Sequence, residues 1–171
     1  SIFDPNASAD HIWSRIWDKP LYANTKVEQG SKNVEMLHGT PLASNFRLIA
    51  SDVWKIDWNR NSTFKWNQNG SYEALGSEIQ SFFEKRHSEF PKFNSTKRKI
   101  ARWRIYRIIN AACGLLRLSN ESNTPMKRLI DLAGGKDWTN EKLHHVFMDY
   151  FSLGAITTDH ALTDLGLAIK P

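Results

Sequence analysis

Apolar residues recur every three to four positions in several stretches, and this spacing predicts helices. The first stretch is Ala9–Asp18, which Pro20 ends. Its apolar side holds four large residues: Ile12, Trp13, Ile16 and Trp17. Tyr72–Phe90 is a second amphipathic helix that Pro91 ends, and Ser95–Leu118 is predicted to be one long helix. We therefore expect helices over residues 9–18, 72–90 and 95–118.

The pattern between residues 33 and 66 is different and favours strands. Leu21–Lys32, which precedes it, is polar and typical of a loop. Four short runs rich in β-branched and aromatic residues follow, with the sequences NVEML, FRLIA, VWKIDW and TFKW. Because polar and apolar positions alternate in VWKIDW, we predict a small antiparallel sheet with one polar face. A helical interpretation of NFRLIASDVW remains open.

The last fifty residues predict two more helices. Pro125 lies in the first turn of one, Met126–Ala133, which closes at Gly134-Gly135. Thr139 or Asn140 caps the other. Its inward side is expected to hold Leu143, Val146, Phe147 and Tyr150.

The segment LGAITTDHALTDLGLAI then resembles the end of a winged-helix domain. The resemblance rests on Leu153, Gly154 and Ile156, followed by Leu162, Thr163 and Gly166, and covers Arg102–Ile169 at most. It implies that Gly154 makes a left-handed turn and that Thr157–His160 form the tip of a β-wing.

These elements predict an α+β fold that is mainly helical, with a small N-terminal antiparallel sheet and a C-terminal winged-helix-like unit. We expect an N-terminal α+β part over residues 1–91 (helix 9–18, strands within 33–66, helix 72–90). Residues 92–171 would hold the long basic helix and the winged-helix-like part. Because the sequence opens SIFDPNASAD without Met, we interpret it as one compact unit excised from a larger protein.

The distribution of charged residues is the observation that bears most on function. No acidic residue occurs between Glu89 and Glu121, whereas eight of the 23 Lys and Arg residues lie there. They are Lys92, Lys97, Arg98, Lys99, Arg102, Arg104, Arg107 and Arg117. The rest of the chain holds 15 basic and 18 acidic residues, so the formal net charge of +5 is local. A concentrated basic segment is typical of a surface that binds a polyanion.

Aromatic residues are interleaved with these charges along the predicted helix. Trp103 and Tyr106 fall on the side opposite the apolar stripe, together with Lys99, Arg107 and Asn110. We predict that the eight basic residues contact or extend a phosphate-binding patch and that Trp103 and Tyr106 pack against sugars or bases. The alternative is a helix buried on both sides, with the aromatic rings in the core and the charged groups reaching outward.

The helix that would read DNA in a winged-helix domain is poorly suited to that task here. Thr139–Leu153 exposes two carboxylates, one lysine and a methionine but no arginine. We therefore assign DNA contact to the basic helix and a supporting role to the C-terminal unit. The face with Glu141, His145 and Met148 is a candidate surface for a protein partner.

Enzymatic chemistry has little support. His38-Gly39-Thr40 is similar to a short motif of ADP-ribosyltransferases, but we interpret it as a turn, because isolated matches of three residues are weak. Asp52 and Asp57 near Lys55 do not form a nuclease motif, and we interpret Asp57 and Lys55 as a surface ion pair. The adjacent His144 and His145 point about 100° apart on a helix, so they cannot share one metal ion.

The sequence thus predicts a non-enzymatic DNA-binding domain without a metal or cofactor, acting on duplex or partly duplex DNA. A protein-interaction module and an RNA-binding domain remain as alternatives. A single cysteine, Cys113, excludes an internal disulfide and fits a reducing intracellular compartment, the cytoplasm or the nucleoid or nucleus. No apolar stretch is long enough for a membrane span.

Overall fold

A computed structural model describes residues 3–54, 100 and 102–167. Every regular element in that part of the chain is helical. The N-terminal part contains α1 (Ala9–Ile16), α2 (Lys19–Tyr22), α3 (Val27–Leu37), α4 (Pro41–Ser44) and α5 (Phe46–Trp54). The second part contains α7 (Arg102–Glu121), α8 (Pro125–Leu132), the short 3-10 helix η2 (Gly135–Asp137), α9 (Asn140–Phe151) and α10 (Ala155–Asp164).

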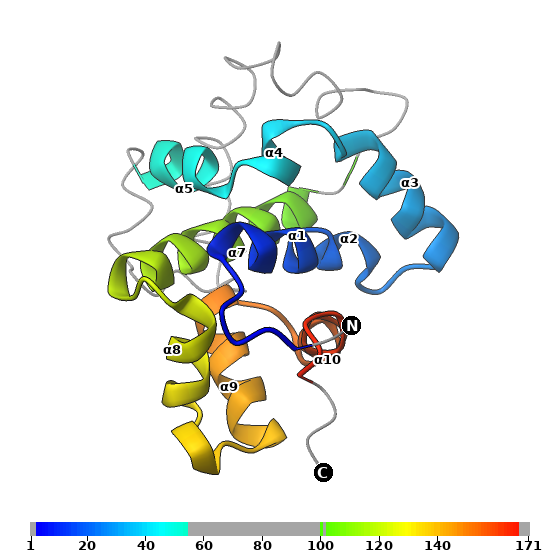
Figure 1. The fold of residues 1–171 in the computed structure, drawn as a ribbon. Helices are drawn as coiled ribbons and strands as arrows, with labels where there is room; N and C mark the ends of the chain where they lie inside the picture. The colour runs from blue at the N-terminus through cyan, green and yellow to red at the C-terminus, as the bar shows by residue number, and fades with distance from the viewer. Residues whose placement is uncertain (1–2, 55–99, 101, 168–171) are drawn as a thin grey trace, which may run out of the picture.

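The long helix α7 lies at the centre of the molecule (Figure 1). It contacts α1, α2 and α5 from the N-terminal part and α8 and α9 from the C-terminal part. Its apolar stripe explains this position, because Ile105, Ile108, Ile109, Ala112 and Leu115 are all buried. Packing against α7 therefore links both parts of the chain.

The middle of α7 is covered on more than one side. Ala111 and Leu118 are buried as well, and Asn110, which the sequence places on the exposed side, is only 3% exposed. Gly114 allows α9 to approach closely, because a Cβ atom there would lie 1.7 Å from the backbone oxygen of Tyr150. The predicted alternative of a helix buried on both sides therefore describes the middle of α7.

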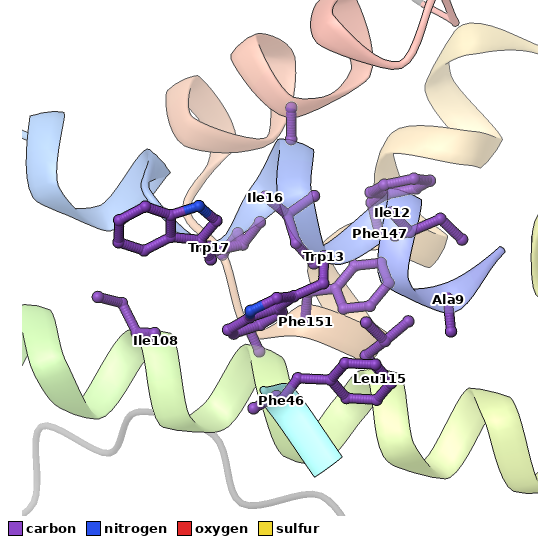
Figure 2. Close-up of a cluster of buried hydrophobic side chains, with 14 of the residues drawn as sticks. Ala9, Ile12, Trp13, Ile16, Trp17, Phe46, Ile108, Leu115, Phe147 and Phe151 are labelled. Carbon is purple, nitrogen blue, oxygen red and sulfur yellow. The ribbon is translucent and has the colours of Figure 1, made fainter. Parts of the chain in front are cut away.

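Helix α1 forms as the sequence predicts and lies across α7. Ser8 caps its N-terminus by accepting a hydrogen bond from the backbone N–H of His11 (3.1 Å). Its four predicted apolar residues are buried. Trp13 packs against Phe46 of α5, with ring centroids 5.9 Å apart, and donates its indole N–H to the oxygen of Ala43 (2.9 Å). Figure 2 shows these rings beside Leu115 of α7 and near Phe147 and Phe151 of α9.

The predicted antiparallel sheet is wrong for the described residues. The run NVEML lies in α3, and FRLIA lies in α5, where VWKIDW also begins. The polar segment Leu21–Lys32, predicted to be a loop, contains part of α2 and the first turns of α3. The rest of VWKIDW, the run TFKW and the predicted helix Tyr72–Phe90 lie outside the described residues.

The spacing of the buried side chains explains this correction. Phe46, Ile49 and Ala50 are fully buried and are separated by three and four positions, which places them on one side of a helix. Packing of this side against α7 outweighs the strand preference of the aromatic and β-branched residues, which depends strongly on context. Strand propensity was therefore the weaker signal in this stretch.

The winged-helix expectation is also corrected, because the predicted wing is helical. Thr157–His160 lie inside α10, and Thr158, Ala161 and Leu162 are buried at helical spacing. Gly154 has an extended backbone (φ −70°) and precedes α10, whereas Ser152 adopts the left-handed conformation (φ 52°) after α9. The turn thus comes two residues earlier than predicted, and a helix replaces the β-wing.

The helices predicted before that point are confirmed. Helix α8 has Pro125 in its first turn, and Gly134 and Gly135 follow with φ values of 117° and 61°. The hydroxyl of Thr139 caps α9 by accepting from the backbone N–H of Lys142 (3.2 Å). Leu143 and Phe147 of α9 are buried, and Val146 and Tyr150 are partly buried.

Candidate functional site

The predicted DNA contacts fall into three groups. Lys92, Lys97, Arg98 and Lys99 lie outside the described residues. Arg102, Trp103 and Tyr106 lie in the first turns of α7, and only their backbone is described. The side chains of the remaining three residues are described, and they differ from one another: Arg104, Arg107 and Arg117.

Arg104 holds α7 to the end of α2. Its Nη1 donates to the backbone oxygens of Pro20 (2.9 Å) and Ala23 (2.6 Å). The last carbonyls of a helix have no partner within that helix, so the guanidinium satisfies groups that would otherwise need water. Burial lowers the pKa of Arg104 from its ordinary value, but a guanidinium remains protonated in proteins. Arg104 therefore has a structural task in addition to any contact with DNA.

Arg117 joins the other end of α7 to α9. Its guanidinium lies over the ring of Tyr150, 4.1 Å from the ring centroid, and within 4.0 Å of carboxylate oxygens of Glu121 and Asp149. The Tyr150 hydroxyl donates to Glu121, which Arg128 of α8 also approaches at 3.7 Å. Burial, and then the Glu121 carboxylate, raise the pKa of Tyr150. The charge of Arg117 is thus surrounded by acidic and aromatic groups.

Arg107 occupies a different setting between these two arginines. Its side chain is half-buried, and its Nη1 donates to the backbone oxygen of Ser152 at the left-handed turn between α9 and α10 (3.3 Å). Two hollows adjoin it, and Arg107 and Gly154 line both of them. Arg107 is therefore placed to contact a molecule that enters either hollow.

The first hollow has a volume of about 580 Å³ and lies between the segment Tyr22–Val27 and the first turns of α10. Tyr22, Val27 and Ile156 give it apolar walls, and His160 also lines it. Val27 and Ile156 are 70% and 73% exposed, which is unusual for large aliphatic side chains.

An ion pair lines this hollow. Lys19 bridges the carboxylates of Asp164 and Asp18, with 3.2 Å to Asp18. Burial alone would lower the pKa of Lys19, but the two carboxylates outweigh burial and raise it. Lys19 therefore stays charged and neutralises Asp164.

The second hollow has a volume of about 560 Å³ and is more polar at its edge. His145, Met148 and Asp149 line it together with Arg107 and the turn Ser152–Gly154. His145 and Met148 belong to the predicted protein-contact face, whereas Glu141, also exposed, does not line this hollow. The first hollow was not evident from the sequence, because it forms between a segment predicted to be a loop and the helix that replaces the predicted wing. The second hollow lies between α7 and α9, which were both predicted to be helices.

The residues that were considered for catalysis lie in a turn, in α5 or outside the described residues. His38 follows α3, Gly39 has a φ of 86°, and Thr40 donates its hydroxyl to the oxygen of Leu37 (2.6 Å), so this motif is a turn after a helix. Asp52 lies in α5, and Lys55 and Asp57 are not among the described residues.

The two adjacent histidines are separated as their positions on a helix require. His144 lies 3.2 Å from Asp159 and 3.0 Å from the backbone oxygen of Ala155, and so connects α9 to α10, whereas His145 lines the second hollow. In residues 3–54 and 102–167 no group of three or more potential ligands could hold a metal ion. The helices in the same ranges include none that is long and apolar enough to cross a membrane.

No protein-family model, curated protein or solved structure matches this chain.

Proposed function

We propose that this chain is a non-enzymatic DNA-binding domain that contacts the phosphate backbone through its basic segment. The observation that carries the proposal is the charge pattern, with eight basic and no acidic residues between Glu89 and Glu121. Each phosphate that such a segment neutralises releases condensed counterions, which favours binding. We expect duplex or partly duplex DNA to be the ligand, within a larger DNA-transaction protein.

The contacts of the arginines suggest which of them hold α7 in place and which contact phosphate. Arg104 and Arg117 fix α7 to α2 and α9, so they hold the helix in place rather than supply the main phosphate contacts. The proposed phosphate contacts are then the other six basic residues: Lys92, Lys97, Arg98, Lys99, Arg102 and Arg107. Trp103 and Tyr106 are proposed to pack against sugars or exposed bases.

A charge-reversal experiment tests this proposal. Fluorescence anisotropy would measure binding of the whole chain to single-stranded, blunt duplex and recessed-end DNA. The test variant is Lys97→Glu/Lys99→Glu, and the control is Lys127→Glu/Lys136→Glu, which makes the same change of charge at exposed lysines of α8 and η2. We expect the test variant to weaken binding about tenfold or more, and the control to change it far less.

The outcomes separate the proposal from its alternatives. Equal weakening by both variants would indicate a response to net charge and contradict a local contact surface. Tighter binding of a matched RNA duplex would favour the RNA-binding alternative.

A protein-interaction module is the second candidate, and the second hollow favours it. Met148 is partly exposed beside the exposed His145, and methionine adapts well to the shape of a partner. If no DNA binds at low salt and His145→Glu/Met148→Glu abolishes capture of a defined partner, this candidate would replace the first.

A further inference from the structure

We propose that the first hollow receives one unpaired base of the bound DNA, with the ring of Tyr22 stacked on the base and Val27 and Ile156 enclosing it. This inference rests on the proposed contact with DNA and extends that contact from the phosphate backbone to a base. Phosphate contacts position a protein on DNA, whereas contacts with bases supply selectivity.

The hollow adjoins the first turns of α7. Ala23 lines it and accepts a hydrogen bond from Arg104 through its backbone oxygen, and Arg107 lines it directly. Apart from Arg107 and Arg117, the other basic residues of the segment precede Arg104 in the chain. A DNA strand held at the first turns of α7 would therefore lie beside the hollow.

The ring of Tyr22 is held in position at the hollow. It packs against Gly30 of α3, where a Cβ atom would collide with the ring carbons, so glycine leaves the room that the ring needs. The Tyr22 hydroxyl also lies 3.5 Å from the Oγ of Ser31. The side chain remains half-buried and lines the hollow. An aromatic ring fixed in this way is suited to stacking, and every base has a face that can stack on it.

The size and walls of the hollow also suit a base. Its volume of about 580 Å³ falls within the range of roughly 300–1,000 Å³ that is typical of ligand sites. Val27, at the start of α3, and Ile156, in the first turn of α10, line it and are the two most exposed large aliphatic side chains among the described residues. A base in the hollow would remove apolar surface of both from water, which is favourable.

The charged groups that line the hollow are engaged with other parts of the protein, which favours an uncharged ligand. Lys19 is bound to Asp18 and Asp164, and Arg107 donates to the backbone oxygen of Ser152. A nucleobase carries no formal charge, so none of these interactions has to break when it enters.

Polar side chains at the hollow suit the edge of a base. Asn24, Thr25 and Thr157 line it, and each can donate as well as accept hydrogen bonds. Because the edges of the bases present both donors and acceptors, these side chains can bind a base without selecting one kind.

Two duplexes that differ by a single base test this inference. Both carry one extra nucleotide as a bulge; that nucleotide bears thymine in one duplex and is abasic in the other. The bulge is already unpaired, so no base pair has to open. Because the number of phosphates is the same, the ratio of the two dissociation constants isolates the contribution of the base. Measured by anisotropy with the whole chain, the thymine bulge should bind at least about tenfold more tightly, as expected for one stacked base.

Variants of the hollow locate the base. Ile156→Glu changes a side chain that is 73% exposed, whereas Leu132→Glu makes the same change on α8, at a side chain that is 40% exposed and does not line the hollow. A general repulsion of DNA by the added carboxylate cancels in the ratio. We expect Ile156→Glu to bring the ratio close to one and Leu132→Glu to leave it unchanged. Tyr22→Ala should also remove the preference, and Tyr22→Phe, which keeps the ring, should retain it.

Two results would overturn the inference alone. One is a ratio near one for the unchanged chain that binds both duplexes. The other is a preference that persists in both Ile156→Glu and Tyr22→Ala, because the base would then bind elsewhere. Lys97→Glu/Lys99→Glu should weaken binding to both duplexes and keep the ratio. Absence of binding to either duplex at low salt would contradict the proposed function itself, and this inference with it, so the two failures are distinguishable.

Discussion

Two stretches of α7 differ in their surroundings: the stretch with Gly114 and Arg117, which is called the packed side, and the stretch at Arg107 two turns earlier, which is called the open side. On the packed side, Gly114 lies directly against the backbone of Tyr150, and Arg117 is enclosed by acidic and aromatic groups. On the open side, Arg107 adjoins two hollows. One helix thus serves as the centre of the core and supplies a charged group to a surface. The surroundings of each arginine, rather than its charge, indicate its task.

The largest loss of stability is expected from a substitution on the packed side. Gly114→Ala would place a Cβ atom 1.7 Å from the Tyr150 oxygen, so α7 and α9 would have to move apart. We expect a loss of about 3 kcal/mol or more in the free energy of unfolding, because backbone atoms cannot give way as a flexible side chain can. Urea denaturation measures this loss. An unchanged midpoint would show that the two helices are not packed this closely.

The next largest loss of stability is expected from the arginine that links α7 to α2. Arg104→Met removes donors from the carbonyls of Pro20 and Ala23 and should cost about 2 kcal/mol, as is typical of hydrogen bonds from charged groups. Arg47→Met is the matched control, because Arg47 is half-exposed in its pair with Asp10 and such surface pairs contribute less than about 1 kcal/mol. Equal losses in the two variants would contradict a structural role for Arg104.

Cys113, which is buried on the packed side, is expected to make the free energy of unfolding depend on pH. Burial raises the pKa of its thiol to about 12 from 9.0. Above pH 9 the unfolded state therefore loses this proton while the folded state keeps it, and stability falls as the pH rises. We expect a loss of about 1.4 kcal/mol per pH unit above pH 9 from this group. Denaturation at pH 8 and pH 10 should show a smaller loss in Cys113→Ala than in the unchanged chain.

The smallest effect on stability is expected at the open side. Ile156→Glu should change the free energy of unfolding by less than about 0.5 kcal/mol, as is usual for exposed positions. Thermal denaturation beside Leu132→Glu would measure it. A loss as large as that of Arg104→Met would show that the hollow is part of the core, and the comparison between the two sides would fail.

How much of the fold was predictable depends on which signal decided each element. Helices α1, α8 and α9 were predicted because caps, proline and glycine mark their ends in the sequence. Helix α5 was kept only as an alternative, because its aromatic and β-branched residues outweighed the helical spacing of Phe46, Ile49 and Ala50. Helix α10 was missed, because a family resemblance outweighed the spacing of Thr158, Ala161 and Leu162. Both helices pack on partners distant in sequence, which a local pattern does not reveal.

The candidate site was predictable only in its charge. The basic run was evident in the sequence, but which arginines serve the fold depends on carbonyls more than eighty positions away, those of Pro20 and Ala23. The hollow beside Arg107 was not predictable, because it forms where residues near position 25 meet residues near position 155.

The dependence of DNA binding on salt tests the central claim most directly. The affinity of the whole chain for a blunt duplex would be measured by anisotropy at several salt concentrations. Six phosphate contacts predict a slope of about −5 for the logarithm of the association constant against the logarithm of salt concentration. Lys97→Glu/Lys99→Glu should bring that slope about two units closer to zero. A slope near zero, or no binding at low salt, would contradict the account.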